Sequence, residues 1–171
     1  MNNNIEEFIK AINNDNYLLL TILLPNIDKE EVLIKASEKG HLKVVKFLVA
    51  NGADIHAWDN KALRFASEYG HLKVIKYLVD NGANIHANDN YALSLASMHG
   101  YLEIVKYLVK KGANIHSQDN AALRWASYYG HLEIVKYLVE HGADIHAKEN
   151  GALIWASEFG YLEIVSYLES F

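Results

Sequence analysis

Apolar and polar positions recur along this chain with a step of 30 residues. The stretch 120–149 reads NAALRWASYYGHLEIVKYLVEHGADIHAKE, and the two stretches of the same length before it repeat its pattern. In the second half of this unit, Glu133, Lys136 and Glu140 share one polar stripe, while the remaining positions form a wide apolar arc. The pattern predicts a helix that begins near Leu132 and is covered on both flanks by neighbouring copies.

The first half of the unit predicts a shorter helix, from about Ala121 to Tyr129. Gly130 allows the chain to reverse after it, and Gly142 allows the second helix to end in a left-handed residue. Asn120, preceded by Asp119, is expected to act as the N-cap of the shorter helix, because its side-chain oxygen can accept hydrogen bonds from first-turn amides. Each unit therefore reads as two antiparallel helices and a loop.

The run A-L-x-x-A-S-x-x-G-H-L-E-I-V-K-Y-L-V-x-x-G-A-D-I-H-A resembles the ankyrin repeat, over about residues 29 to 171 and more weakly before them. The resemblance implies an all-α solenoid of stacked antiparallel helix pairs. The family's usual step is about 33 residues. Here the missing residues fall where the family forms its β-hairpin fingers, so we expect shortened fingers or loops. Short-step repeats that carry these I-H-A and A-L-x-x-A-S motifs are also similar to the expanded ankyrin families of large-genome viruses.

The repeats predict a single domain, because the chain has one proline and no Ser/Pro-rich linker. Glu169 replaces the valine of earlier copies, as expected of a terminal unit with a polar outer side. The expected organisation over residues 1–171 is a degenerate N-terminal capping repeat at 1–28, repeats at 29–59, 60–89, 90–119 and 120–149, and a truncated C-terminal capping repeat at 150–171.

The N-terminal unit departs from the pattern in its second helix. Phe8, Ala11 and Ile12 match the buried places of a first helix. In the segment from Tyr17 to Leu24, Leu18 falls where later copies carry lysine. Either a local register shift buries Leu18, or the segment exposes an apolar patch that binds something.

Composition excludes several classes of function. A formal net charge of -5 and a pI near 6.0 argue against nucleic-acid binding. The absence of cysteine excludes disulfides and fits a reducing compartment. The longest apolar run is far below the ~20 residues that span a bilayer, and the N-terminus has no basic leader. We expect a cytoplasmic location, in the host cell if the protein is viral, and no contact with membranes.

The histidines are expected to be structural. Seven of the nine occupy repeat positions in the G-H-L turn or the I-H-A loop. Tyr101 and Tyr161 replace histidine in the turn, which a packing role tolerates and catalysis does not. No Ser-His-Asp arrangement or phosphate loop occurs, so we expect no enzyme, metal, cofactor or small-molecule substrate. The family resemblance also implies hydroxylation as a modification of the I-H-A histidines, here His56, His86, His116 and His146.

Positions that repeat in every copy are fixed by stacking, whereas residues at positions that vary between copies can contact a partner. The place just before the turn glycine holds Tyr69, His99, Tyr129 and Phe159, and in the ankyrin family it lies on the concave binding face. Tyrosine, tryptophan and arginine are frequent binding anchors. The predicted protein-binding residues are Tyr69, His99, Tyr128, Tyr129, Phe159, Arg64, Arg124, Trp58 and Tyr91.

The sequence thus predicts a monomeric protein-binding module that uses a concave aromatic groove and the finger loops. Alternatively, the aromatic residues only fill space left by short fingers, as Phe65, Trp125 and Trp155 are expected to do within the core. A second alternative is a structural protein that docks or dimerises through the segment from Tyr17 to Leu24.

Overall fold

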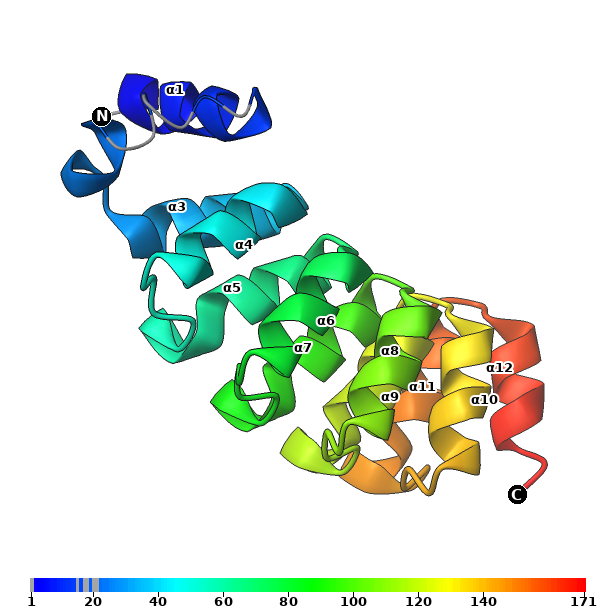
Figure 1. Ribbon diagram of the computed structural model, residues 1–171. Helices are drawn as coiled ribbons and strands as arrows, with labels where there is room; N and C mark the ends of the chain where they lie inside the picture. Colours follow the sequence, from blue (N-terminus) through cyan, green and yellow to red (C-terminus); the bar gives the residue numbers. More distant parts are fainter. Residues whose placement is uncertain (1, 15, 17–18, 20–21) are drawn as a thin grey trace. The chain divides into compact units, whose positions relative to one another are not determined.

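The computed structural model describes residues 2–14, 16, 19 and 22–171, and these residues contain helices and no strand (Figure 1). The helices are α1 (Asn2–Asn13), the 3-10 helix η1 (Leu24–Asn26), α3 (Lys29–Glu38), α4 (Leu42–Ala50), α5 (Ala57–Glu68), α6 (Leu72–Asp80), α7 (Ala87–Met98), α8 (Leu102–Lys110), α9 (Ser117–Tyr128), α10 (Leu132–Glu140), α11 (Ala147–Glu158) and α12 (Leu162–Leu168). The predicted all-α repeat of helix pairs is confirmed. None of the described helices is long and apolar enough to cross a membrane.

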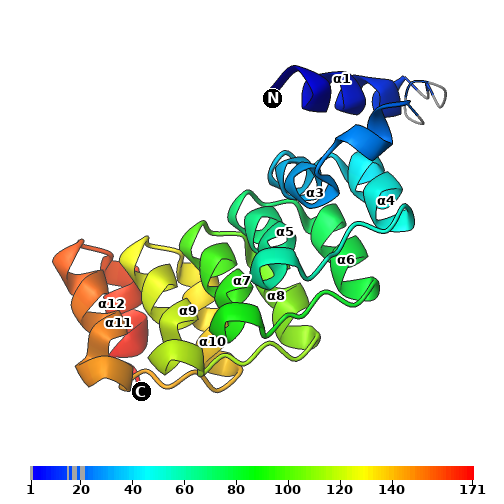
Figure 2. The same cartoon turned by 90° about the vertical axis from the view of Figure 1, so that its left-hand side faces the viewer.

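The helices form two compact units, Met1–Asn84 (unit 1) and Ile85–Phe171 (unit 2). In unit 2, α9 packs against α7 and α11 in a layer of first helices, and α10 packs against α8 and α12 in a layer of second helices (Figures 1 and 2). In unit 1, α3 packs on α5, and α4 packs on α1 and α6. The prediction of one domain over residues 1–171 stays a prediction.

Equivalent residues of successive copies form the core. Leu63, Leu93 and Leu123 are buried at one place of the first helix, and Ala66, Ala96 and Ala126 are fully buried three residues later. The small alanines allow the two helices of a pair to approach closely, as the sequence predicts. The second helices bury Val45, Ile75, Val105 and Val135.

The first helix of the N-terminal unit follows the predicted pattern. Phe8, Ala11 and Ile12 of α1 are buried, and the Phe8 ring meets Phe47 of α4 edge-on, with centroids 5.9 Å apart. The predicted helix from Tyr17 to Leu24, with Leu18, lies largely outside the described residues.

The expected shortening of the fingers takes the form of a left-handed turn. Residues 58–60, 88–90, 118–120 and 148–150 all have positive φ, between 49° and 65°. In the first of these turns the Asn60 amide donates to His56 O at 3.1 Å. Three consecutive left-handed residues reverse the chain in a short space, at a cost of roughly 1–2 kcal/mol for each residue.

The turn asparagine does not cap its own helix, so the N-cap prediction for Asn120 is wrong. Asn120 is buried, and its Oδ1 accepts from the Asp144 amide in the following loop at 2.9 Å. Asn60 and Asn90 accept in the same way from Asn84 and Asn114, each at 2.8 Å. Because the residue adopts the left-handed conformation, its side chain reaches the next loop instead of the first turn of its own helix.

Candidate functional site

Five rings of unit 2 form one aromatic cluster, made of Trp125, Tyr128, Tyr129, Trp155 and Phe159. Tyr128 is at its centre, with ring centroids 4.7 Å from Tyr129, 5.3 Å from Trp155 and 4.4 Å from Phe159. The Trp125 ring lies 5.5 Å from Trp155 and 6.2 Å from Tyr129. These edge-on and tilted contacts, at 4.5–7 Å or slightly less, are the arrangements that aromatic side chains prefer, so the rings support one another.

The cluster is open to solvent on one side. Tyr129 and Phe159 are the C-cap residues of α9 and α11, and they are 44% and 45% exposed. Trp125 and Trp155 are half-buried, as is Phe65 at the same repeat place in unit 1. The prediction that these three residues lie within the core is therefore wrong. They lie beneath the exposed rings, while Leu95 at the same place in α7 is buried.

Arg124 of α9 is held beside the cluster by two kinds of contact. Its guanidinium donates to Gln118 O at 3.0 Å and Asp119 O at 3.1 Å, carbonyls of the left-handed turn. Its Cζ also lies 5.4 Å from the centroid of the Trp155 ring. Gly151 makes room for it, because a Cβ at this glycine would lie 3.1 Å from Arg124 Cδ. Arg124 thus stabilises the turn and borders the cluster.

Unit 1 has a smaller aromatic group, in which an exposed C-cap ring again contacts a half-buried ring. Tyr69 is the exposed C-cap of α5, and its ring meets Phe65 edge-on at 6.4 Å. Lys61 Nζ lies 5.5 Å from the Trp58 ring and 5.2 Å from the Phe65 ring. Arg64 donates to Trp58 O at 2.8 Å, as Arg124 does to its own turn.

The remaining predicted site residues lie on α7 and its C-cap. His99 is exposed and stacks on Tyr101 with centroids 6.2 Å apart, whereas Tyr91 is half-buried. The predicted column from Tyr69 through His99 to Phe159 includes residues of both units. Its continuity from one unit to the other stays a prediction.

Two of the three G-H-L histidines, His71 and His131, have the structural role that the sequence predicts. His131 Nε2 lies 2.9 Å from Met98 O, at the carboxyl end of α7 in the preceding copy. His71 Nε2 lies 2.7 Å from Glu38 O in the same relation. A carbonyl can only accept, so Nε2 carries the proton and donates. Each histidine therefore satisfies a terminal helix carbonyl and joins two copies.

Replacing His131 with alanine should lower the free energy of unfolding by about 1 kcal/mol, the usual contribution of one such hydrogen bond. Urea unfolding followed by circular dichroism measures this change. His116→Ala is the matched control because His116 is exposed in the I-H-A loop, and it should change stability by less than about 0.5 kcal/mol. Equal losses for the two variants would contradict this role.

One ion pair joins two turns beside the cluster. Lys148 Nζ lies 2.9 Å from Asp119 Oδ2, and both side chains are exposed. The hydrogen bond from Lys148, followed by its charge, holds the pKa of the Asp119 carboxyl below its ordinary value. Because solvent screens exposed charges, this pair contributes little to stability.

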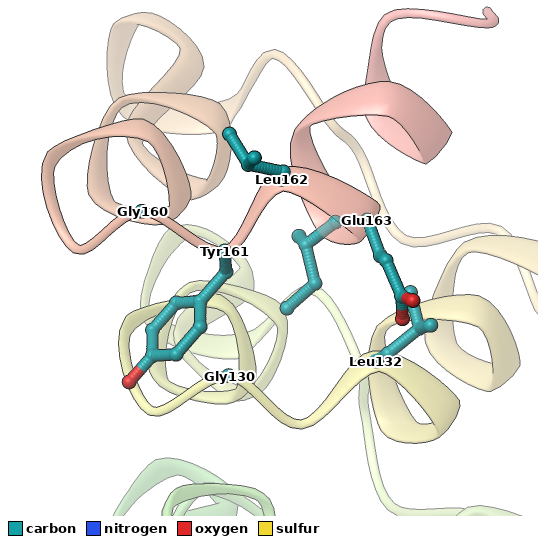
Figure 3. Close-up of a pocket in the computed structure, with 7 residues that line it drawn as sticks. Gly130, Leu132, Gly160, Tyr161, Leu162 and Glu163 are labelled. Carbon is teal, nitrogen blue, oxygen red and sulfur yellow. The ribbon is translucent and has the colours of Figure 1, made fainter.

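A cavity in the described part of unit 2 is lined by none of the five rings of the aromatic cluster. It has a volume of about 280 Å³ and lies between the turns of the last two helix pairs, where Tyr161 packs beside Gly130 (Figure 3). Its lining residues are Gly130, Leu132, Gly160, Tyr161, Leu162, Glu163 and Ile164. No predicted site residue is among them. The described part of the chain also has no group of three or more residues placed to hold a metal ion.

Comparisons with known proteins agree with the repeat organisation. The family model described as ankyrin repeats (3 copies) matches residues 8–89 and 93–170. A search of curated proteins finds no match to the chain. The matched ranges include the five rings of the aromatic cluster and leave out residues 90–92, among them Tyr91.

Proposed function

The chain belongs to the ankyrin-repeat family, and on this premise we propose that it binds a partner protein through its exposed C-cap aromatic residues and the left-handed turns beside them. The observation that carries the proposal is the aromatic cluster of unit 2. Tyr129 and Phe159 are large, partly exposed and supported from below by other rings. Because their positions are fixed before binding, little side-chain freedom is lost when a partner covers them.

Ankyrin repeats generally mediate protein–protein interactions and are typically non-enzymatic. Two features of the surface support this function for the present chain. The cluster is an open face bordered by a fixed arginine, and aromatic and arginine side chains are the usual anchors of protein interfaces. A small-molecule site would instead be a concave pocket that encloses most of its ligand.

Affinity capture tests the proposal with a Tyr129→Ser/Phe159→Ser variant. Loss of two aromatic anchors, each worth roughly 2 kcal/mol or more, should reduce partner retention at least about 100-fold. Leu162→Ser/Phe171→Ser is the matched control, because it removes two exposed apolar side chains outside the cluster. If the control variant loses the same partner to the same extent, the aromatic surface is not the site.

Trp58 contributes to the proposed surface at the cost of backbone strain. It is 55% exposed and has a φ of 49°, which is unusual for a bulky residue. The next copy has asparagine at this place, Asn88, with almost the same dihedral angles. The turn imposes this conformation in each of the four copies, and at Trp58 it places a large exposed ring beside the proposed surface.

Trp58→Asn is therefore expected to leave the free energy of unfolding within about 0.5 kcal/mol of the wild type or to raise it, because asparagine tolerates the left-handed region. Partner retention should fall at the same time. Thermal unfolding and affinity capture measure the two effects. A variant that loses stability and keeps full binding would show that Trp58 is structural.

Self-association through the segment from Tyr17 to Leu24 is the alternative function. Ile22 supports it, because this apolar residue is exposed in unit 1. Light scattering over a range of concentrations tests it with Ile22→Lys. A mass that rises with concentration in the wild type and not in the variant supports self-association, and a constant monomer mass in both excludes it.

A further inference from the structure

Several polar groups of the aromatic cluster make no hydrogen bond to any residue that the structure describes. They are the indole nitrogens of Trp125 and Trp155 and the hydroxyls of Tyr128 and Tyr129. An indole nitrogen can only donate, and a tyrosine hydroxyl can donate or accept. The carbonyls of the neighbouring left-handed turn, Gln118 O and Asp119 O, already accept from Arg124. The cluster therefore offers a ligand mainly hydrogen-bond donors.

The exposed rings are spaced like the turns of a polyproline II helix. Tyr129 and Phe159 occupy the same place in adjacent copies, and Tyr128 contacts both rings, with centroids 4.7 Å and 4.4 Å away. Helices α9 and α11 pack side by side (Figure 2), and packed helices are roughly 8–10 Å apart. A polyproline II helix has three residues in each turn and rises about 9.3 Å per turn. One turn of such a segment therefore spans one copy.

A proline-rich segment also matches the hydrogen-bonding character of the cluster. Proline has no backbone N–H, and a polyproline II helix has no internal hydrogen bonds, so the carbonyls of the segment are free to accept. In an α-helix the same carbonyls are used internally. An added β-strand needs the edge of a sheet, and the described residues contain no strand. Among the three conformations of a bound segment, polyproline II fits this surface best.

The charges beside the cluster indicate a basic residue at one end of the ligand. Lys148 is paired with Asp119, and the guanidinium of Arg124 is held at the same turn, so both cations lie near the start of α11. Glu158 ends α11 and directly precedes Phe159. It is exposed and has no ion pair or hydrogen bond with the described residues. Its carboxylate can therefore pair with a lysine or arginine of the ligand.

We propose that the aromatic cluster binds a proline-rich segment of a partner protein, with a lysine or arginine of that segment beside Glu158. The inference rests on the proposed function, because it specifies the ligand of the same surface. The segment lies across the carboxyl ends of α9 and α11, its proline rings pack on Tyr129 and Phe159, and its carbonyls accept from the indole and hydroxyl donors. Because the segment is already extended before it binds, little of its conformational freedom is lost.

Fluorescence anisotropy with a labelled peptide of one arginine and nine prolines tests the proposal on the full chain. The comparison peptide has alanine in place of every proline. The wild type should bind the proline peptide at least about tenfold more tightly. Tyr129→Ser/Phe159→Ser should weaken binding of the proline peptide at least about tenfold, because two anchors are lost. The control variant, Leu162→Ser/Phe171→Ser, should bind within about twofold of the wild type.

Two single substitutions test the donors and the charge separately. Tyr128→Phe keeps the ring, removes the hydroxyl and should weaken binding about fivefold, as expected for one hydrogen bond. Glu158→Gln should weaken binding of the arginine-containing peptide about two- to threefold, and it should leave unchanged the binding of a peptide with glutamine in place of arginine. Glu163→Gln, which changes another exposed glutamate, is the matched control and should affect neither peptide.

Three results would overturn the proposal. These are equal binding of the proline and alanine peptides, binding of neither, and tighter binding of an amphipathic helical peptide of leucine and lysine. If one of them is found while Tyr129→Ser/Phe159→Ser still loses a partner in affinity capture, the cluster binds a protein by another kind of segment, and only the proline-rich ligand is excluded. If capture is also independent of the two rings, the proposed function fails as well.

Discussion

Replacing Asn90 with alanine is expected to lower the free energy of unfolding by about 3–5 kcal/mol, the largest effect of any single substitution considered for this chain. Asn90 is buried, and its Oδ1 accepts from the Asn114 amide at 2.8 Å. Its Nδ2 donates to Ser117 Oγ at 2.7 Å. Alanine leaves these groups of the following loop without their partner, and it also adopts the left-handed conformation, with φ of 59°, less readily than asparagine does.

Asn150→Ala is the matched control for this substitution. Asn150 has the same left-handed conformation, with φ of 65°, but it is exposed, and its Oδ1 lies 2.7 Å from His146 Nδ1 of its own turn. Alanine at position 150 should therefore cost about 1–2 kcal/mol, from the left-handed conformation and the loss of this exposed hydrogen bond, which Asn90 also makes within its own turn, to His86 Nδ1 at 3.0 Å. Urea unfolding of both variants measures the difference. If the two losses are equal, the contact with the following loop contributes nothing.

Gly100→Ala is expected to lower the free energy of unfolding by about 2–4 kcal/mol. The glycine has a φ of 79°, and a Cβ at this position would lie 2.7 Å from His131 Cε1. The imidazole ring then has to move, and its hydrogen bond to Met98 O is lost. The effect thus combines the strain of a left-handed alanine with the loss of a contact between two copies.

Gly112→Ala separates these two contributions. Gly112 also has a positive φ, 97°, but no heavy atom lies within 4 Å of a Cβ placed there. Alanine at this site should cost only about 1–2 kcal/mol. In addition, His131→Ala should cost less in the Gly100→Ala background than in the wild type, because the hydrogen bond is already broken. Fully additive losses would show that Gly100 and His131 act independently.

The repeat architecture could be predicted from sequence because each copy has the same pattern of small and apolar positions. The small pair at Ala126 and Ser127 and the apolar arc after Leu132 fix two helices and their mutual approach. Their agreement over successive 30-residue steps leaves few other folds. The G-H-L turn was also predictable, since tyrosine at Tyr161 serves the same packing role as histidine.

The left-handed turns could not be predicted from the same information. Nothing in the sequence shows that Trp58, Asp59 and Asn60 have positive φ, because propensity favours a right-handed start for the helix that follows. The role assigned to Asn120 was wrong for this reason. The loop that Asn120 contacts lies 24 residues later in the sequence, and a pattern of local caps contains no information about it.

The exposed aromatic surface was predicted only in part. The exposed C-cap places of Tyr129 and Phe159 follow from variation between copies, but the expectation that Trp125 and Trp155 fill space within the core, left by short fingers, is wrong. A signal was present at their repeat place, where Leu95 is replaced by tryptophan in the two later copies. A ring too large for the buried site has to extend to the surface.

Site-specific photo-cross-linking is the most direct test of the central claim that the aromatic cluster is a protein-binding surface. Benzoylphenylalanine is placed at position 129 in one sample and at position 162 in another, where Leu162 is 76% exposed outside the cluster. The account predicts a covalent adduct with a partner protein from position 129 and none from position 162. Adducts only from position 162, or a partner that co-purifies with the chain and is never cross-linked from position 129, would contradict it.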